Sequence, residues 1–182
     1  IKRERKKVRE QERETQRQYV NRESHYLWGK RYLLKVVEAE ESPRVKQKHS
    51  QLILHVRPGS DRDKKREVMM QWYRSLIKEE AVALIKEWEP KMKVKVSSLF
   101  VQRMKTKWGS CNPVAGNIRL NSELAKKPLE CLEYILVHEM VHLLEPTHNH
   151  RFVKLMNRFM PQWTQHRDAL NRLPVRHEDW VY

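Results

Sequence analysis

The chain has 182 residues, of which 39% are hydrophobic and 34% charged, and its 38 Lys and Arg against 23 Asp and Glu give a net charge of +15. This length suits one well-filled core and is too short for two ordinary domains. The composition excludes a disordered or fibrous chain, and no apolar run approaches the roughly 18 residues that span a bilayer. The opening residues contain no apolar stretch of the kind found in secretory signals, so we expect a cytoplasmic protein with no membrane partner.

Residues 1–23 are strongly basic, with nine Lys and Arg, five Glu and few large apolar side chains. Because this segment has no apolar stripe to bury, it is predicted to be a solvated helix or arm, and a nucleic-acid-binding arm is the sharper alternative. We therefore divide the chain into a basic N-terminal arm at residues 1–23 and a single domain at residues 24–182.

The first half of this domain has the pattern of strands followed by a long helix. The stretches HYLWGKRYLLKVV and VKQKHSQLILHV predict three or four mostly antiparallel strands. Apolar residues at three- and four-residue spacing from Asp61 to Glu89 predict a long amphipathic helix that Pro90 closes. A strand in SSLFVQRMKTKW and a short one in NIRLN, joined by the loop WGSCNPVAG, predict a hairpin.

The second half of the domain reads as helical. A helix is expected from Pro128, a favourable first helical residue, to Pro146, where a proline ends it. Two short helices are expected on either side of Pro161, at residues 151–160 and 163–173. The predicted fold class is therefore α+β, with an N-terminal antiparallel β-sheet and a long helix, followed by a helical part.

The helix that precedes Pro146 carries the stretch VHEMVHLLEPTHNH. His138 and His142 are four residues apart, so a helix brings both imidazoles within reach of one ion. Glu139 lies beside them, where it can contact a metal-bound water. This is the HExxH pattern of zinc peptidases. The alternative is a partly buried helix with two hydrogen-bonded histidines.

A catalytic zinc ion needs a third protein ligand, and the sequence offers several candidates. Glu145 lies about 10 Å from His138 along the helix axis, too far for both to share one ion comfortably. A glutamate on the next helix is disfavoured, because no Asp or Glu lies between His150 and Arg167.

The remaining candidates are His148 and His150. Pro146 lets the chain turn back across the site, and Asn149 is a good N-cap for the following helix. This leaves His148 in the turn and His150 at the helix start, so we favour His148 as the third ligand.

Three separated motifs resemble the YgjP-like metallopeptidase family, a group of small zincins related to SprT and WLM domains: RMKTKWGSC at residues 103–111, GNIRLN at 116–121 and VHEMVHLLEPTHNHRF at 137–152. RESHYLWGKRYLLKVVE and LILHVRPG extend the resemblance over nearly everything after residue 20. The resemblance implies a zincin-like helical part carrying the HExxH helix. It also implies one zinc ion bound by His138, His142 and His148, with Glu139 as the catalytic residue. Other divalent metals are alternatives.

The turn departs from the family pattern. The family usually has Asn, His and Ser there, whereas this chain has Thr147, His148 and Asn149. The histidine keeps its place, so the departure affects only its surroundings. Trp108, Gly109 and Ser110 belong to the resemblance as well, but from the residues alone they read as an ordinary turn with an aromatic anchor.

The combined prediction is a zinc-dependent hydrolase, first of all a metallopeptidase in which Glu139 takes a proton from a metal-bound water. GNIRLN is the candidate edge strand for pairing with an extended peptide, unless it only closes the sheet. The alternative is hydrolysis of an anionic substrate, because Arg151, Lys154 and Arg158 form a basic stripe after the motif. In this alternative the enzyme cleaves a phosphoanhydride or another phosphate bond of a nucleotide. A further alternative is a peptidase that acts on proteins held at DNA.

A non-enzymatic alternative is a DNA-associated module that contacts nucleic acid through its basic surface and contains structural zinc. Structural zinc usually has four protein ligands, and Cys111 is the candidate fourth one only if its loop folds over the site. Cys131 is expected to be a buried core thiol.

Overall fold

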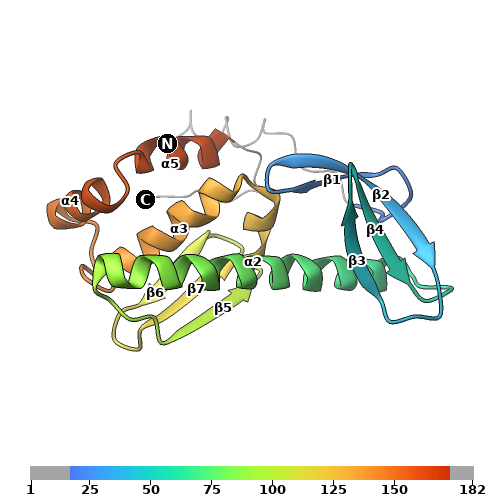
Figure 1. Cartoon of the computed structure of the whole chain (residues 1–182), viewed down its shortest axis with the longest axis horizontal. Helices are drawn as coiled ribbons and strands as arrows, with labels where there is room; N and C mark the ends of the chain where they lie inside the picture. Colours follow the sequence, from blue (N-terminus) through green and yellow to red (C-terminus); the bar gives the residue numbers. More distant parts are fainter. Residues whose placement is uncertain (1–16, 173–182) are drawn as a thin grey trace, which may run out of the picture.

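The computed structural model describes residues 17–172, and these residues form two sheets that one long helix connects (Figure 1). The strands of the first sheet, sheet A, are β1 (Ser24–Leu27), β2 (Lys30–Glu38), β3 (Arg44–Lys48) and β4 (Gln51–Val56). Their order is β1-β2-β4-β3, with a parallel central pair and antiparallel outer pairs. The predicted number of strands and their mostly antiparallel pairing are confirmed.

The long helix α2 (Arg62–Met92) runs from sheet A to the other half of the molecule (Figure 1). Asp61 caps its first turn by accepting a hydrogen bond from the Lys64 N–H at 2.9 Å. The prediction that Pro90 closes the helix is wrong, because Pro90 lies inside the last turn. Trp88 and Met92, on either side of the proline, are both buried in the core, and this packing favours continuation of the helix to Met92.

The second sheet, sheet B, corrects two predictions. Its strands are β5 (Ser98–Gln102), β6 (Gly109–Asn112) and β7 (Asn117–Asn121), in the order β5-β7-β6. The predicted hairpin with its loop is wrong: residues expected to form the loop are strand β6, which pairs antiparallel with β7, while β5 pairs parallel with β7. The GNIRLN segment is therefore the central strand, and the prediction that it is the free edge strand is wrong. Its Ile118 and Leu120 side chains are buried, and a central strand allows more complete burial than an edge strand does.

The helical part follows sheet B directly. Its elements are the 3-10 helix η1 (Ser122–Lys126), α3 (Leu129–Val141), α4 (His150–Phe159) and α5 (Trp163–Arg172). Pro128 is the residue before α3, and α3 ends at Val141 rather than continuing to Pro146. His142 still has helical backbone angles, and its N–H points to the His138 carbonyl. The two short helices around Pro161 are confirmed, and the α+β fold class is confirmed with them.

A single hydrophobic core joins the two sheets through α2 and α3. Figure 1 shows α3 between sheet B and α5, and its buried side chains include Ile135, Val137 and Met140. Of the basic arm, only residues 17–23 are described, and there Tyr19 is buried against the core. The predicted nucleic-acid-binding role of the remaining arm lies outside the described residues. Within residues 17–172, no helix combines the length and apolar character needed to cross a membrane.

Candidate active site

Helix α3 supplies two of the three clustered histidines. His138 is buried, with 2% of its surface exposed, and His142 is half-buried one turn later. Their ring centroids are 5.0 Å apart, and Phe152 from α4 packs against both rings at 4.9 and 4.7 Å. Because the C-terminal half of α3 is buried on nearly all sides, the helix holds this pair in a fixed position.

The turn after α3 supplies the third histidine. The Glu145 N–H bonds to the Val141 carbonyl at 2.9 Å, and Pro146 then redirects the chain. Asn149 caps α4 by accepting a hydrogen bond from the Phe152 N–H at 3.1 Å, as the sequence predicted. The exposed His148 thereby faces the α3 pair, with its Nε2 3.0 Å from Nε2 of His138.

One ring nitrogen from each of His138, His142 and His148 lies within 4.8 Å of the other two, and among residues 17–172 this is the group that could hold a metal ion. His150 and Cys111 do not belong to it. Two nitrogens that bind one tetrahedral zinc ion at 2.0–2.1 Å are about 3.3 Å apart, close to the 3.0 Å found here between His138 and His148. The cluster therefore fits a divalent metal ion.

Hydrogen bonding and protonation also suit metal binding. Nδ1 of His142 lies 3.1 Å from the Glu145 carbonyl oxygen, which leaves Nε2 to face the cluster. Burial, together with His142 and His148, lowers the pKa of His138 to about 3. Burial also lowers the pKa of His142 and His148. All three imidazoles are therefore neutral at neutral pH, which is the form that binds a metal ion.

Glu139 lies beside the cluster and is 2% exposed. Burial raises the pKa of its carboxyl group to about 8, and the Lys107 ammonium opposes this shift. A divalent cation at the three histidines would oppose it too, because a nearby positive charge favours the carboxylate.

Strand β6 packs directly against Glu139, which the sequence did not predict. A Cβ atom at Gly109 would lie 2.7 Å from Oε1 of Glu139 and 2.9 Å from Cγ2 of Ile135. Gly109 does not have a positive φ angle, so its backbone conformation does not require glycine. Glycine is required at this position because a side chain would overlap the Glu139 carboxylate. The glycine thus belongs to the site, and its only sequence signal was the family motif around it.

Two other residues considered in the sequence lie outside the cluster, as expected. Glu145 accepts hydrogen bonds from Thr147 and lies 3.5 Å from Arg151, so its carboxylate stabilises the turn rather than joining the cluster. Cys131 is buried at 1% exposure, which confirms it as a core thiol.

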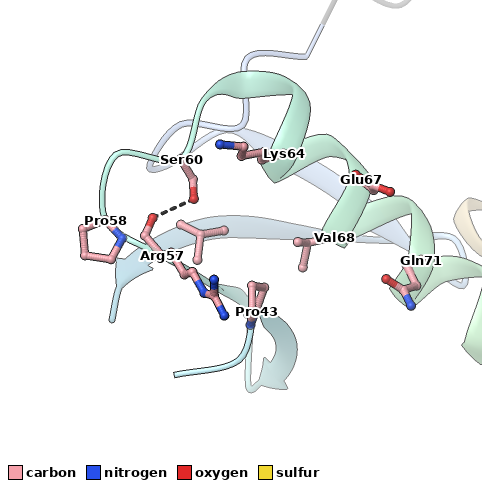
Figure 2. Close-up of a pocket in the computed structure, with 9 residues that line it drawn as sticks. Pro43, Arg57, Pro58, Ser60, Lys64, Glu67, Val68 and Gln71 are labelled. Carbon is pink, nitrogen blue, oxygen red and sulfur yellow. Dashed lines mark hydrogen bonds between the residues drawn. The ribbon is translucent and has the colours of Figure 1, made fainter. Parts of the chain in front are cut away.

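A separate pocket of about 580 Å³ lies between the end of β4 and the first turns of α2, at the other end of the molecule from the histidines (Figures 1 and 2). Figure 2 shows the Ser60 hydroxyl donating a hydrogen bond to the Arg57 carbonyl at its rim. The lining carries both signs of charge, from Arg57, Lys64 and Glu67. None of the described metal-binding groups lies there.

Comparison with known families defines the class of the protein. The sequence pattern of the family described as "YgjP-like, metallopeptidase domain" matches residues 1–173, which is nearly the whole chain. This family makes the protein a metallohydrolase. The chain belongs to the YgjP-like metallopeptidase family, as the sequence motifs predicted.

Two solved structures are similar in part. One is the metallopeptidase zymogen abylysin of Pyrococcus abyssi, with 19% identity and a TM-score of 0.46 over 50% of this chain and 90% of that one. The other is the metallopeptidase zymogen jannalysin of Methanocaldococcus jannaschii, with 19% identity and a TM-score of 0.42 over 53% of this chain and 94% of that one. No curated protein sequence matches the chain. A peptide or protein substrate follows from the family.

Proposed function

We propose that the protein is a zinc-dependent peptidase in which His138, His142 and His148 hold one metal ion and Glu139 is the catalytic residue. The observation that carries this proposal is the convergence of three neutral imidazoles beside a buried glutamate, in a chain of a metallopeptidase family. Three histidine ligands leave a fourth position open, as catalytic zinc requires.

When bound, a zinc ion would supply Lewis acidity that favours deprotonation of water and stabilises negative charge on the carbonyl oxygen of the substrate. Glu139 accepts the proton from the attacking water on its carboxylate oxygen and later donates it to the leaving amine. The buried surroundings of Glu139 favour the protonated form, which makes it a competent acid for the second step.

The substrate is proposed to lie along β6. This strand is an edge of sheet B in the described residues and packs against α3 through Gly109. The Asn121 N–H bonds to the Trp108 carbonyl at 2.8 Å, so in this antiparallel pair Ser110 also directs its backbone groups toward β7. The backbone N–H and C=O groups of Gly109 and Cys111 point the other way, where an extended peptide can pair with them.

The experiment that tests this function compares the unaltered protein with Glu139→Gln, His142→Ala and the control Glu130→Gln. Glu130 is exposed near the start of α3, so its loss leaves the site intact. Zinc content is measured alongside cleavage of casein, unstructured peptides, nucleoside triphosphates and DNA.

Glu139→Gln is expected to retain zinc and to lower peptide kcat/KM by at least about 10²-fold, within the range of a general base. His142→Ala is expected to lose both zinc and activity, whereas Glu130→Gln keeps both. Normal activity in Glu139→Gln would remove this residue from the mechanism. Hydrolysis of triphosphates without cleavage of any peptide would replace the peptidase by the alternative phosphohydrolase.

A further inference from the structure

Charge is distributed unevenly around the three histidines. Residues 90–122, from the end of α2 through sheet B, contain no Asp or Glu, and neither do residues 146–167, from the turn through α4. The Lys and Arg residues of these two segments are Lys91, Lys93, Lys95, Arg103, Lys105, Lys107, Arg119, Arg151, Lys154, Arg158 and Arg167. Residues 61–89 of the capped helix α2, by contrast, hold seven acidic and seven basic residues. These two segments therefore carry eleven basic and no acidic side chains, although residues 1–60 also carry an excess of positive charge.

Three of these cations lie in the loop that leads into β6: Arg103, Lys105 and Lys107, named here the basic loop. All three are exposed, and none forms an ion pair with another residue in the range 17–172. Lys91 and Lys95, in contrast, are paired with Glu87 and Glu89 on α2. The basic loop thus presents positive charge that the described part of the fold does not neutralise.

The buried side chain of Asn121 fixes the basic loop in place. Its Nδ2 donates to the carbonyls of Met104 and Lys107 at 3.0 and 2.8 Å, and its Oδ1 accepts from the Met104 N–H at 3.3 Å. Asn121 is 2% exposed and lies at the end of the central strand β7. The loop is therefore held at the start of β6 rather than projecting freely.

Lys107 is the member of the basic loop closest in sequence to the strand that contacts Glu139. It lies two residues before Gly109, where a Cβ atom would lie 2.7 Å from Oε1 of Glu139. Glu145, the other buried acidic residue of this region, already has partners, because it accepts a hydrogen bond from Thr147 and lies 3.5 Å from Arg151.

We propose that the site selects peptide segments with acidic side chains, whose carboxylates bind the basic loop while the backbone pairs with β6. This inference rests on the proposed peptidase function. Exposed charges at the rim of a binding site mainly raise the association rate and favour one charge class of partner, and both effects weaken as salt screens the charges.

The test uses three fluorogenic peptides that differ only at two positions flanking the cleaved bond, occupied by Asp, Ser or Lys. The loop variant carries Arg103→Gln, Lys105→Gln and Lys107→Gln. The matched control carries Lys35→Gln, Lys46→Gln and Lys48→Gln, which removes the same charge from exposed positions of sheet A.

At 50 mM salt we expect the Asp peptide to exceed the Ser peptide in kcat/KM by at least about 10-fold, as electrostatic steering allows. The ratio of the two kcat/KM values should fall toward one in the loop variant, and also in the unaltered protein at about 0.5 M salt. It should remain unchanged in the control variant. Equal rates for all three peptides would overturn the charge selection while leaving the peptidase intact.

Binding to the Glu139→Gln protein, followed by fluorescence anisotropy, measures the same preference without turnover. One outcome is that the Asp peptide binds in a loop-dependent way while the unaltered protein cleaves none of the peptides. This outcome would support the selection of acidic peptides and refute the peptidase function. Absence of a preference for the Asp peptide would overturn the selection. A DNA oligonucleotide that displaces the Asp peptide in a loop-dependent way, and binds more tightly, would identify nucleic acid as the partner and overturn it as well.

Discussion

The two sides of the histidine cluster differ in how they are held. His138 lies in a helix whose neighbouring residues are all buried, and it is itself almost inaccessible. His148 lies in an exposed turn that is positioned by the Asn149 cap and by hydrogen bonds between Thr147 and Glu145. One side of the cluster is part of the core, whereas the other side is part of the surface.

This difference has a functional consequence. The buried side fixes the imidazole of His138 and the carboxylate of Glu139 with the precision of core packing. If a metal ion binds there as proposed, the exposed side would keep a coordination position open to water and to the peptide proposed to lie along β6. Catalysis at a metal ion needs both properties, because the reacting groups must be held rigidly while the substrate enters.

The largest expected effect comes from removing a ligand on either side. His138→Ala and His148→Ala should each lose the metal and lower kcat/KM by more than about 10³-fold, since the Lewis acid is lost. In the presence of a chelator, however, the free energy of unfolding of His138→Ala should be about 1–3 kcal/mol lower than that of the unaltered protein, because the substitution leaves a cavity in the core. His148→Ala should change the free energy of unfolding by less than about 0.5 kcal/mol, as exposed substitutions do.

Zinc content and urea unfolding measure these two quantities separately. The Lys154→Ala variant, altered at an exposed position of α4, serves as a control for surface truncation. If both histidine variants had the same metal-free stability, the buried and exposed sides would not differ in the way described.

A smaller effect is expected where β6 contacts the buried side. In Gly109→Ala the new methyl group would overlap the Glu139 carboxylate, which must move. Displacement of a catalytic group by about 1 Å costs roughly 10²-fold in rate, so we expect kcat to fall by about 10- to 100-fold with zinc retained.

Two further variants separate this steric effect from damage to the strand. Ser110→Ala alters the neighbouring residue, whose side chain faces the opposite side of sheet B, and should leave kcat unchanged. In a Glu139→Asp background, where the carboxylate is shorter, Gly109→Ala should reduce kcat by a smaller factor than it does beside Glu139. Full activity of Gly109→Ala would show that the carboxylate tolerates the displacement.

The histidines and the turn that holds them were predictable because their geometry is local. His138 and His142 share one helix, Pro146 interrupts it, and Asn149 caps the next one, so spacing and capping rules suffice. The preference for His148 over His150 came from the same local rules, and the structure places His148 in the cluster.

Sheet B was predicted less well because its pairing is not local. Gly109 and Asn112 have low β propensity, so β6 reads as a loop until β7 pairs with it. The parallel pairing of β5 with β7 spans the whole of β6 and leaves no mark on the sequence between them. The requirement for glycine at position 109 comes from Glu139, thirty residues later, so no local pattern can reveal it.

The pH dependence of stability tests whether burial dominates at a histidine far from the cluster. His25 in sheet A is 4% exposed, and burial lowers its pKa although Glu23 opposes this shift at 2.7 Å; Arg17 and Lys126 reinforce it. The unfolded chain therefore binds a proton below pH 6.5 that the folded chain does not, and stability falls as the pH decreases through this value.

The variant His25→Asn removes this contribution. Its free energy of unfolding in chelator should vary less steeply between pH 6.5 and 5 than that of the unaltered protein, by at most about 1.4 kcal/mol per pH unit. The exposed variant His49→Asn serves as the control and should leave the slope unchanged. A slope unaffected by His25→Asn would mean that the ion pair with Glu23 fully offsets burial, and a steeper slope in the variant would mean that the ion pair outweighs it.

The smallest expected effect concerns the exposed side alone. Asn149→Ala removes the hydrogen bond to the Phe152 N–H and should lower the free energy of unfolding by about 1 kcal/mol, as the loss of an N-cap does. Because the cap also positions His148, zinc affinity should decrease while the His138 and His142 pair stays in place. Asn149→Asp keeps an acceptor at the cap and should restore both quantities, measured by urea unfolding and by competition with a chelator. If Asn149→Ala weakened stability without weakening zinc binding, the turn would hold His148 independently of the cap, and the exposed side would be more rigid than its surroundings indicate.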